Sequence, residues 1–221
     1  MAGLQDFAIF EDDFWGADTY STAGQGTPWA IADTSAAGSP TYASVTPSAT
    51  GEVALTMAAT SEVENLCLSF GDTLCFDIDN VVSFEARVKV SGCTSGTTLG
   101  FGLCSARNDT IGSITARANF RMTGATSTTA VTVETDDNVV DSGLISTGAT
   151  LATVYKKFYI DFSGGKSNVK FFIDGVRVAG STVFSMANYT ASLQPFFQIQ
   201  KAANTNVDAI TIDYVRVELK R

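Results

Sequence analysis

The stretch Val82-Ser83-Phe84-Glu85-Ala86-Arg87-Val88-Lys89-Val90 alternates apolar and polar side chains without interruption. Successive side chains of an extended strand point to opposite faces, so the apolar members lie on one face and the polar members on the other. A strand of this kind packs on a core with one face and meets water or polar partners with the other. The stretch therefore predicts a half-buried antiparallel strand.

The same period of two recurs along most of the chain, for example at 53–57 and 158–162. Asp174-Gly175 lies between two apolar runs, which is the strongest short signal for a β-hairpin. Residues 210–219 change parity midway, which predicts a bulge or burial on both faces. Further strands are expected at 7–14, 29–32, 66–70, 99–105, 114–122, 130–134 and 195–201. The pattern predicts an all-β, antiparallel β-sandwich or jelly roll with little or no helix, the best helix candidate being 184–191.

The composition supports one domain with a real core. Hydrophobic residues make up 45% of the 221 residues and charged residues 17%. We therefore expect a single β-sandwich domain over 1–221. Residues 15–50 differ, because they are rich in Gly, Ala, Ser, Thr and Pro, and we expect a long loop or extended arm there. Such a segment either reaches a partner or packs on its own domain, and the sequence does not choose between these alternatives.

The charge balance excludes several partners. The formal net charge is −9, and the longest basic clusters are Lys156-Lys157 and Lys220-Arg221, so the chain lacks the basic face that nucleic acid requires. No apolar run is long enough to span a bilayer, so no membrane partner is expected. The first residues lack the pattern of a secretory signal peptide, which predicts synthesis in the cytoplasm.

The residue types available for chemistry are restricted. The chain has no histidine, which removes Ser-His-Asp and Cys-His mechanisms and most zinc sites. The four cysteines form no C-x-x-C pair. Cys67 and Cys104 lie in apolar strands and are interpreted as small core residues. A late disulfide in an extracellular particle remains an alternative.

Three segments in order carry a resemblance to a known superfamily. They are Phe84-Glu85-Ala86-Arg87-Val88-Lys89, the pair of strands from Tyr155 to Asp161 and Val169 to Gly175, and the closing Thr211-Ile212-Asp213-Tyr214-Val215-Arg216-Val217. Together they resemble strands of concanavalin A-like lectins and glucanases. The resemblance covers roughly 7–219 and is firmest from Val82 onward. It implies two curved antiparallel sheets packed face to face.

The glucanase branch of this superfamily uses a strand of the form E-x-D-x-E or E-x-D-x-x-E, whose carboxylates flank a glycosidic bond on the concave side. The only candidate is Glu134-Thr135-Asp136-Asp137-Asn138. Glu134 and Asp136 share a face, but the next position on that face is Asn138, so no second Glu is supplied. We interpret Glu134, Asp136 and Asp137 as a solvated acidic loop. The sequence thus predicts no catalytic residue, no cofactor-binding residue, and a protein that is not an enzyme.

Two further sites are considered and not assigned. The resemblance implies a structural calcium near the closing strand, with Asp213 and either Asp12 or Asp13 as ligands, but the spacing of oxygen ligands does not support one, so no metal site is predicted. An aromatic sugar platform could come from Trp15, Tyr20, Trp29, Tyr42 and Tyr189. The alternative for these rings is core packing or partner contact.

A narrower resemblance concerns the segments Phe10-Glu11-Asp12-Asp13-Phe14, 62–66, 76–80, 101–103 and 194–201. They resemble lectin-like virion proteins of tailed bacteriophages. This implies a non-enzymatic capsid decoration or cement protein on the virion surface, with the major capsid protein and copies of itself as partners, in a homo-oligomer such as a trimer. The alternatives are a carbohydrate-binding module of a phage tail or receptor-binding protein, and a glucanase-like hydrolase.

Overall fold

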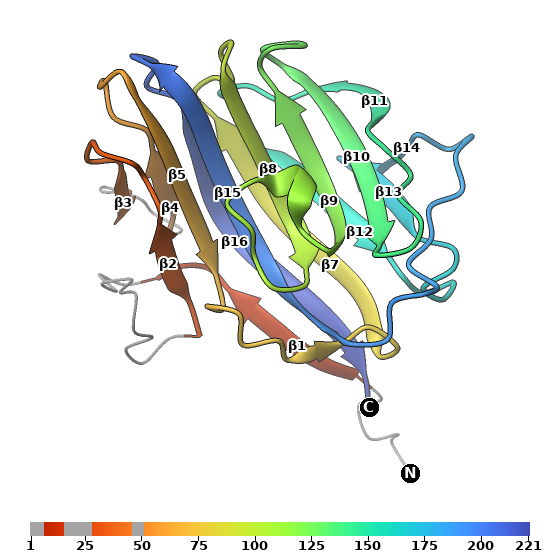
Figure 1. The fold of residues 1–221 in the computed structure, drawn as a ribbon. Helices are drawn as coiled ribbons and strands as arrows, with labels where there is room; N and C mark the ends of the chain where they lie inside the picture. The colour runs from red at the N-terminus through yellow and green to blue at the C-terminus, as the bar shows by residue number, and fades with distance from the viewer. Residues whose placement is uncertain (1–6, 16–27, 46–50) are drawn as a thin grey trace.

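The computed structural model describes residues 7–15, 28–45 and 51–221. They form two antiparallel sheets that pack face to face, as Figure 1 shows. Among these residues the only helical element is a short 3-10 turn, η1 (Ile111–Ser113). No helix in the described part of the chain is long and apolar enough to cross a membrane. The predicted all-β sandwich is confirmed.

Each sheet has a path of seven strands and one further strand beside it. The first sheet has the order β14 (Val176–Val178), β13 (Lys170–Ile173), β12 (Lys156–Asp161), β7 (Val81–Val90), β16 (Ala209–Lys220), β4 (Val53–Thr56) and β3 (Thr41–Ser44), and β1 (Phe7–Asp12) pairs with β16. The second sheet has the order β11 (Ile145–Thr150), β10 (Ala130–Asp137), β9 (Ala116–Thr123), β8 (Thr97–Cys104), β15 (Ser192–Asn204), β5 (Glu62–Ser69) and β2 (Ala30–Asp33), and β6 (Phe76–Asp77) pairs with β15.

The core lies between the two sheets and is rich in phenylalanine. Phe101 of β8 and Phe120 of β9 stack with ring centroids 5.6 Å apart, and Phe158 of β12 meets both rings edge-on from the first sheet. Edge-to-face pairs add about 1 kcal/mol each beyond the area that they bury. The side chains that alternate with these residues point away from the core, and the period-two pattern therefore defines an outer face on each sheet.

Two local predictions hold in detail. Asp174 and Gly175 both have positive φ angles, 51° and 78°, as a two-residue hairpin turn requires, and they join β13 to β14. The register between β16 and β7 shifts between Ile212 and Tyr214, so Asp213 is the extra residue of a bulge. The helix considered at 184–191 does not form. Phe184 instead forms an isolated β-bridge with Val169, and the Asp137 carboxylate accepts the backbone N–H of Asn188.

The segment 15–50, expected as a loop or arm, differs from that expectation where it is described. β2 pairs with β5 at one edge of the second sheet, and β3 pairs with β4 at one edge of the first. Ile31 is buried in the core, and Tyr42 is partly buried and packs against the core. β2 corresponds to the strand expected at 29–32. β3 was missed, because a short edge strand needs few apolar residues and the polar composition gave no sign of it. Residues 16–27 and 46–50 lie outside the described part.

Candidate functional site

A polar cluster lies on the outer face of the second sheet, where β9 and β10 pair. Val131 and Val133 point into the core, so Glu134 and Asp136, which share the other face of β10, point outward. On β9 the same alternation turns Arg117, Asn119 and Arg121 outward. The sequence predicted a strand only to Glu134 and an acidic loop after it, whereas β10 continues to Asp137 and so places Glu134 and Asp136 on one face.

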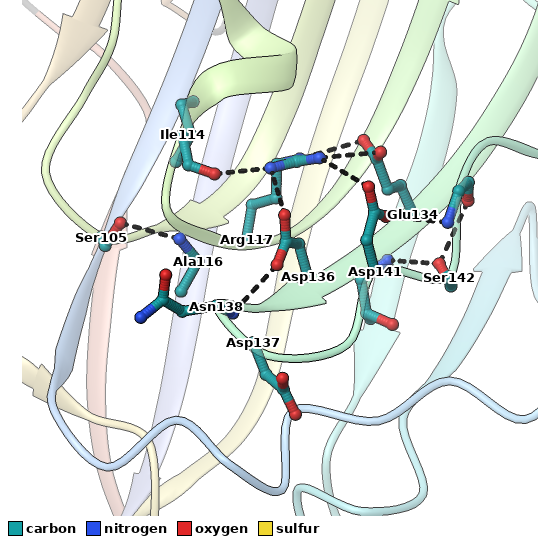
Figure 2. Close-up of polar contacts among 12 residues, drawn as sticks. Ser105, Ile114, Ala116, Arg117, Glu134, Asp136, Asp137, Asn138, Asp141 and Ser142 are labelled. Carbon is teal, nitrogen blue, oxygen red and sulfur yellow. Dashed lines mark hydrogen bonds and ion pairs between the residues drawn. The ribbon is translucent and has the colours of Figure 1, made fainter.

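Arg117 is the centre of this cluster, as Figure 2 shows. It is directly opposite Asp136 in the ladder, and its Nη1 donates to Asp136 Oδ2 over 2.8 Å. Its Nε and Nη2 donate to the two carboxylate oxygens of Glu134, over 3.0 and 2.8 Å. Its Nη1 also donates to the backbone oxygen of Ile114, over 2.5 Å. A planar guanidinium suits this arrangement, because it can bind one carboxylate with two parallel hydrogen bonds.

A third carboxylate joins the cluster because the chain turns sharply after β10. Asn138 has a φ of 72°, a left-handed conformation that Asn tolerates better than most residues. Asp136 Oδ1 accepts the N–H of Asn138 over 2.9 Å, and Asp141 then bridges back to Asp136. The Asp141 carboxylate comes within 3.6 Å of Arg117 Nη2. Asp137 has the opposite parity, and its carboxylate binds Asn188 and the N–H groups of Val139 and Val140.

These contacts correct the interpretation of this segment as a solvated acidic loop. Glu134 is only 3% exposed and Asp137 only 1%. A buried carboxylate is costly unless it has hydrogen-bond partners. Arg117 of β9 binds the Glu134 carboxylate, and neighbouring loops bind that of Asp137. Arg117 and Asp141 were missed in the sequence, since only the strand register and the turn bring them to Glu134. The available signal was an Arg at an outward position of a neighbouring apolar strand.

The electrostatics of the cluster differ between its two arginines. Burial lowers the pKa of Arg117, but the hydrogen bonds and charge of Glu134, with the charges of Asp136 and Asp141, outweigh that effect and leave the pKa above its ordinary value. Arg121 lies 3.8 Å from Glu134, and its pKa is lowered, first by burial and then by the positive charge of Arg117. Three carboxylates therefore face two guanidinium groups.

An open pocket of about 320 Å³ lies beside this cluster. It is lined by residues 112–115 on one side and by Asp136, Asn138, Val139 and Asp141 on the other. The side chain of Asp136 is 18% exposed and that of Asp141 is 50% exposed, whereas Glu134 is covered. The carboxylates that a ligand can reach are thus those of Asp136 and Asp141.

The other sites considered from the sequence do not assemble. Asp213 binds Arg87 Nη1 over 2.5 Å, and Asp12 accepts hydrogen bonds from Trp29 and from the N–H of Phe14. No group of three acidic, Cys or His residues in the described ranges could hold a metal ion, so the residues present do not fit the calcium implied by the resemblance.

The aromatic platform does not form as a unit either. Trp29 is 1% exposed in the core, whereas Trp15 is 64% exposed. Tyr42 and Tyr189 pack partly against the core, and Tyr20 lies outside the described residues. Cys67 and Cys104 are buried as predicted, but in a second apolar cluster on the outer face of the second sheet.

Comparison with solved structures finds many similar folds. A glycoside hydrolase family 16 protein from Bacteroides ovatus, solved with a mixed-linkage glucan product, is 13% identical, with a TM-score of 0.65 over 94% of this chain and 99% of that one. The β-glucanase of Bacillus licheniformis is 14% identical, with a TM-score of 0.63 over 98% of this chain and 99% of that one. A protein of unknown function from Shewanella oneidensis is 12% identical, with a TM-score of 0.61 over 97% and 87%. No protein-family profile matches the sequence, and no curated protein is similar to it.

These comparisons overturn the predicted role of a non-enzymatic capsid decoration protein. Two of the three structures are glycoside hydrolases, and none of the three is a virion protein. The prediction of a non-enzyme rested on a missing second Glu, but the turn at Asn138 brings Asp141 beside Asp136. The expected partners and location were inferred from the capsid role and have no separate support. At this level of identity the comparisons establish the fold: the chain has the concanavalin A-like jelly-roll fold found in family 16 glycoside hydrolases.

Proposed function

We propose that this chain is a carbohydrate-active protein that hydrolyses a β-linked glycan at the pocket beside Arg117. The observation that carries the proposal is the pair of reachable carboxylates, Asp136 and Asp141, which line one open pocket on the outer face of the second sheet. The similar fold of the glucanases supports the choice of substrate class.

Glycoside hydrolysis needs two carboxyl groups at the scissile bond and no histidine. One protonates the leaving oxygen, and the other attacks the anomeric carbon or activates the water that does so. Asp136 accepts hydrogen bonds from Arg117 and from the N–H of Asn138, so its orientation is fixed. This suits the nucleophile or base. Asp141 is the more exposed of the two carboxylates, so it can reach the leaving oxygen, and we assign it as the proton donor.

The test is release of reducing sugar from a linear mixed-linkage β-glucan. Asp136→Asn and Asp141→Asn should each lower the rate by at least about 100-fold, because each removes a group that transfers a proton or attacks carbon. Asp161→Asn is the matched control. Asp161 is also a strand-end carboxylate of low exposure that accepts the N–H two residues on, over 2.8 Å, but it lies on the first sheet.

The control should keep the wild-type rate. Equal loss in all three variants would mean that the effect is on folding. Full activity in both Asp136→Asn and Asp141→Asn would place the chemistry elsewhere. Binding of the glucan without release of sugar would contradict hydrolysis.

A further inference from the structure

The segment between β8 and β9, residues 105–115, lies across the outer face of the second sheet. Figure 1 shows its helical turn η1 in front of the strands. Ile111 and Ile114 point onto the sheet and form an apolar cluster with Phe196 of β15, Cys67 of β5 and Cys104 of β8. Burial raises the pKa of the Cys67 thiol to about 12, as expected where water is excluded. We call this segment the crossing loop.

Outward-facing amides of β15 bind the backbone of the crossing loop. Gln194 Nε2 donates to the oxygen of Ser105 over 3.1 Å, and Gln198 Nε2 donates to the oxygens of Asn108 and Asp109 over 3.0 and 3.2 Å. Gln200 Oε1 accepts the N–H of Ile111 over 3.2 Å. These three glutamines lie on one face of one strand, so they bind the loop at successive points along its length.

The sheet beneath the loop is shaped for it. Gly100 of β8 leaves room for Ile111, since a Cβ at this position would lie only 3.2 Å from the side chain of Ile111. At the other end, Arg117 Nη1 holds the oxygen of Ile114. The crossing loop is thus attached to β8, β9 and β15 by both apolar and polar contacts. We therefore expect it to be held rigidly against the sheet, as a fixed wall.

The wall bounds the proposed active site. Residues 112–115 of the crossing loop form one side of the pocket, and Asp136 and Asp141 lie on the other side. Beyond the loop, at β5 and β2, is a separate pocket lined by Asp33, Ser69, Asp72 and Arg107 among others. A glycan seated beside Asp136 and extending toward β8 and β15 would meet the crossing loop instead of an open sheet.

We infer that the crossing loop restricts the site to the end of a glycan chain or to a short oligosaccharide. This inference rests on the proposed function and gives its substrate class. The physical reason is steric, since sugar residues can extend from the pocket on the side away from the loop but not across it.

Binding stoichiometry tests the inference. Asp141→Asn protein, in which the proposed proton donor is removed to slow turnover, is titrated by calorimetry with a long and a short preparation of the same linear mixed-linkage β-glucan. If chain ends bind, the two preparations should show the same affinity within about twofold when the glucan concentration is expressed as moles of chain ends. If internal stretches bind, the number of binding sites should instead be proportional to the mass of glucan. Sites proportional to mass would overturn the inference and leave the proposed function intact. No binding of either preparation would overturn both.

Hydrogen exchange tests the wall independently of any glycan. The amide of Ile111 should exchange at least about 100-fold more slowly than an unstructured amide, because a fixed loop opens rarely. Gln200→Ala removes its acceptor and should reduce this protection by at least about tenfold. Asn206→Ala is the control. Asn206 lies in the loop after β15 and its side-chain amide donates to the oxygen of Ser95, so its loss should leave the protection of Ile111 unchanged. Unprotected exchange at Ile111 in the wild type would identify a mobile lid and overturn the inference.

Discussion

Two cross-strand ion pairs in the second sheet look alike in the register and differ in their surroundings. Arg117 is opposite Asp136 on β9 and β10, and Lys201 is opposite Glu64 on β15 and β5. Glu64 has the parity of the core residues Leu66 and Leu68, so the Lys201–Glu64 pair points between the sheets. The Arg117 cluster points outward. Arg117, Lys201 and Glu64 are buried, whereas Asp136 lines the pocket and is partly exposed.

The inner pair is closed and balanced. Lys201 Nζ lies 3.5 Å from Glu64 Oε2 and donates to the backbone oxygens of Ala58 and Thr60. Glu64 accepts the N–H of Ala58 and the hydroxyl of Thr60, both over 2.8 Å. The outer cluster has an excess of carboxylates and opens to a pocket. A buried ion pair whose hydrogen bonds are all made within the protein has a structural role. A cluster with more carboxylates than cations, and with carboxylate oxygens exposed in a pocket, can bind a ligand.

The largest expected effect comes from breaking the inner pair. Lys201→Met leaves Glu64 buried without its cation, so the free energy of unfolding should fall by about 3–5 kcal/mol. Urea denaturation at neutral pH measures it. Lys157→Met is the control, because Lys157 also lies 3.5 Å from a carboxylate, Glu85, but is 49% exposed. Its loss should be no more than about 1 kcal/mol. Similar losses in both variants would mean that burial does not distinguish the two pairs.

Breaking the outer cluster should cost less. Arg117→Met leaves Glu134 buried, but Asp136 and Asp141 remain in contact with water at the pocket, so we expect a loss of about 2–3 kcal/mol in the same denaturation experiment. Arg107→Met, which removes one partner of a 2.8 Å pair whose carboxylate, Asp109, is 58% exposed, serves as the control and should lose about 1 kcal/mol or less. A loss for Arg117→Met larger than that for Lys201→Met would reverse the comparison.

The smallest effect concerns Asp137, which adjoins Asp136 but faces inward. Burial raises the pKa of Asp137, but hydrogen bonds from Asn188, Val140 and Val139 outweigh this and leave the pKa below its ordinary value. Because the folded pKa is the lower one, the stabilisation is complete above the unfolded value of about 3.9 and is lost as pH falls through the folded value. Asp137→Asn should therefore destabilise the protein by about 1–2 kcal/mol at pH 7.

Unfolding measured at a series of pH values checks the sign of this effect. The difference between wild type and Asp137→Asn should shrink as the pH falls below about 4. A difference that stays constant down to acid pH would show that the carboxylate charge of Asp137 is not what stabilises the turn.

Much of the fold could be predicted from local pattern. The alternation in 82–90 gives a strand with one buried face, Asp174-Gly175 gives a two-residue hairpin, and the change of parity near Asp213 gives a bulge. These signals are local, since the side-chain period of two and the φ preferences of turn residues act within a few residues. The segment 28–45 was harder, because its two edge strands are short and pair with different sheets.

The site could be predicted only in part. The sequence placed Glu134 and Asp136 on one face, because parity along a strand is a local property. It could not place Arg117 opposite Asp136, which depends on the register of β9 against β10, or Asp141, which depends on the turn at Asn138. Nor could it show that the crossing loop covers β8 and β15, since the contacts of Ile111 and Ile114 join residues far apart in the chain.

The sequence by itself determined that this chain forms an antiparallel sandwich, that it lacks histidine chemistry, and which side chains of each strand share a face. Tertiary structure alone decided that three carboxylates and Arg117 meet beside a pocket, and that a loop closes one side of it. The physical reason is that alternation is set by the geometry of each residue, whereas the meeting of two strands and a loop is set by how all apolar faces are buried together.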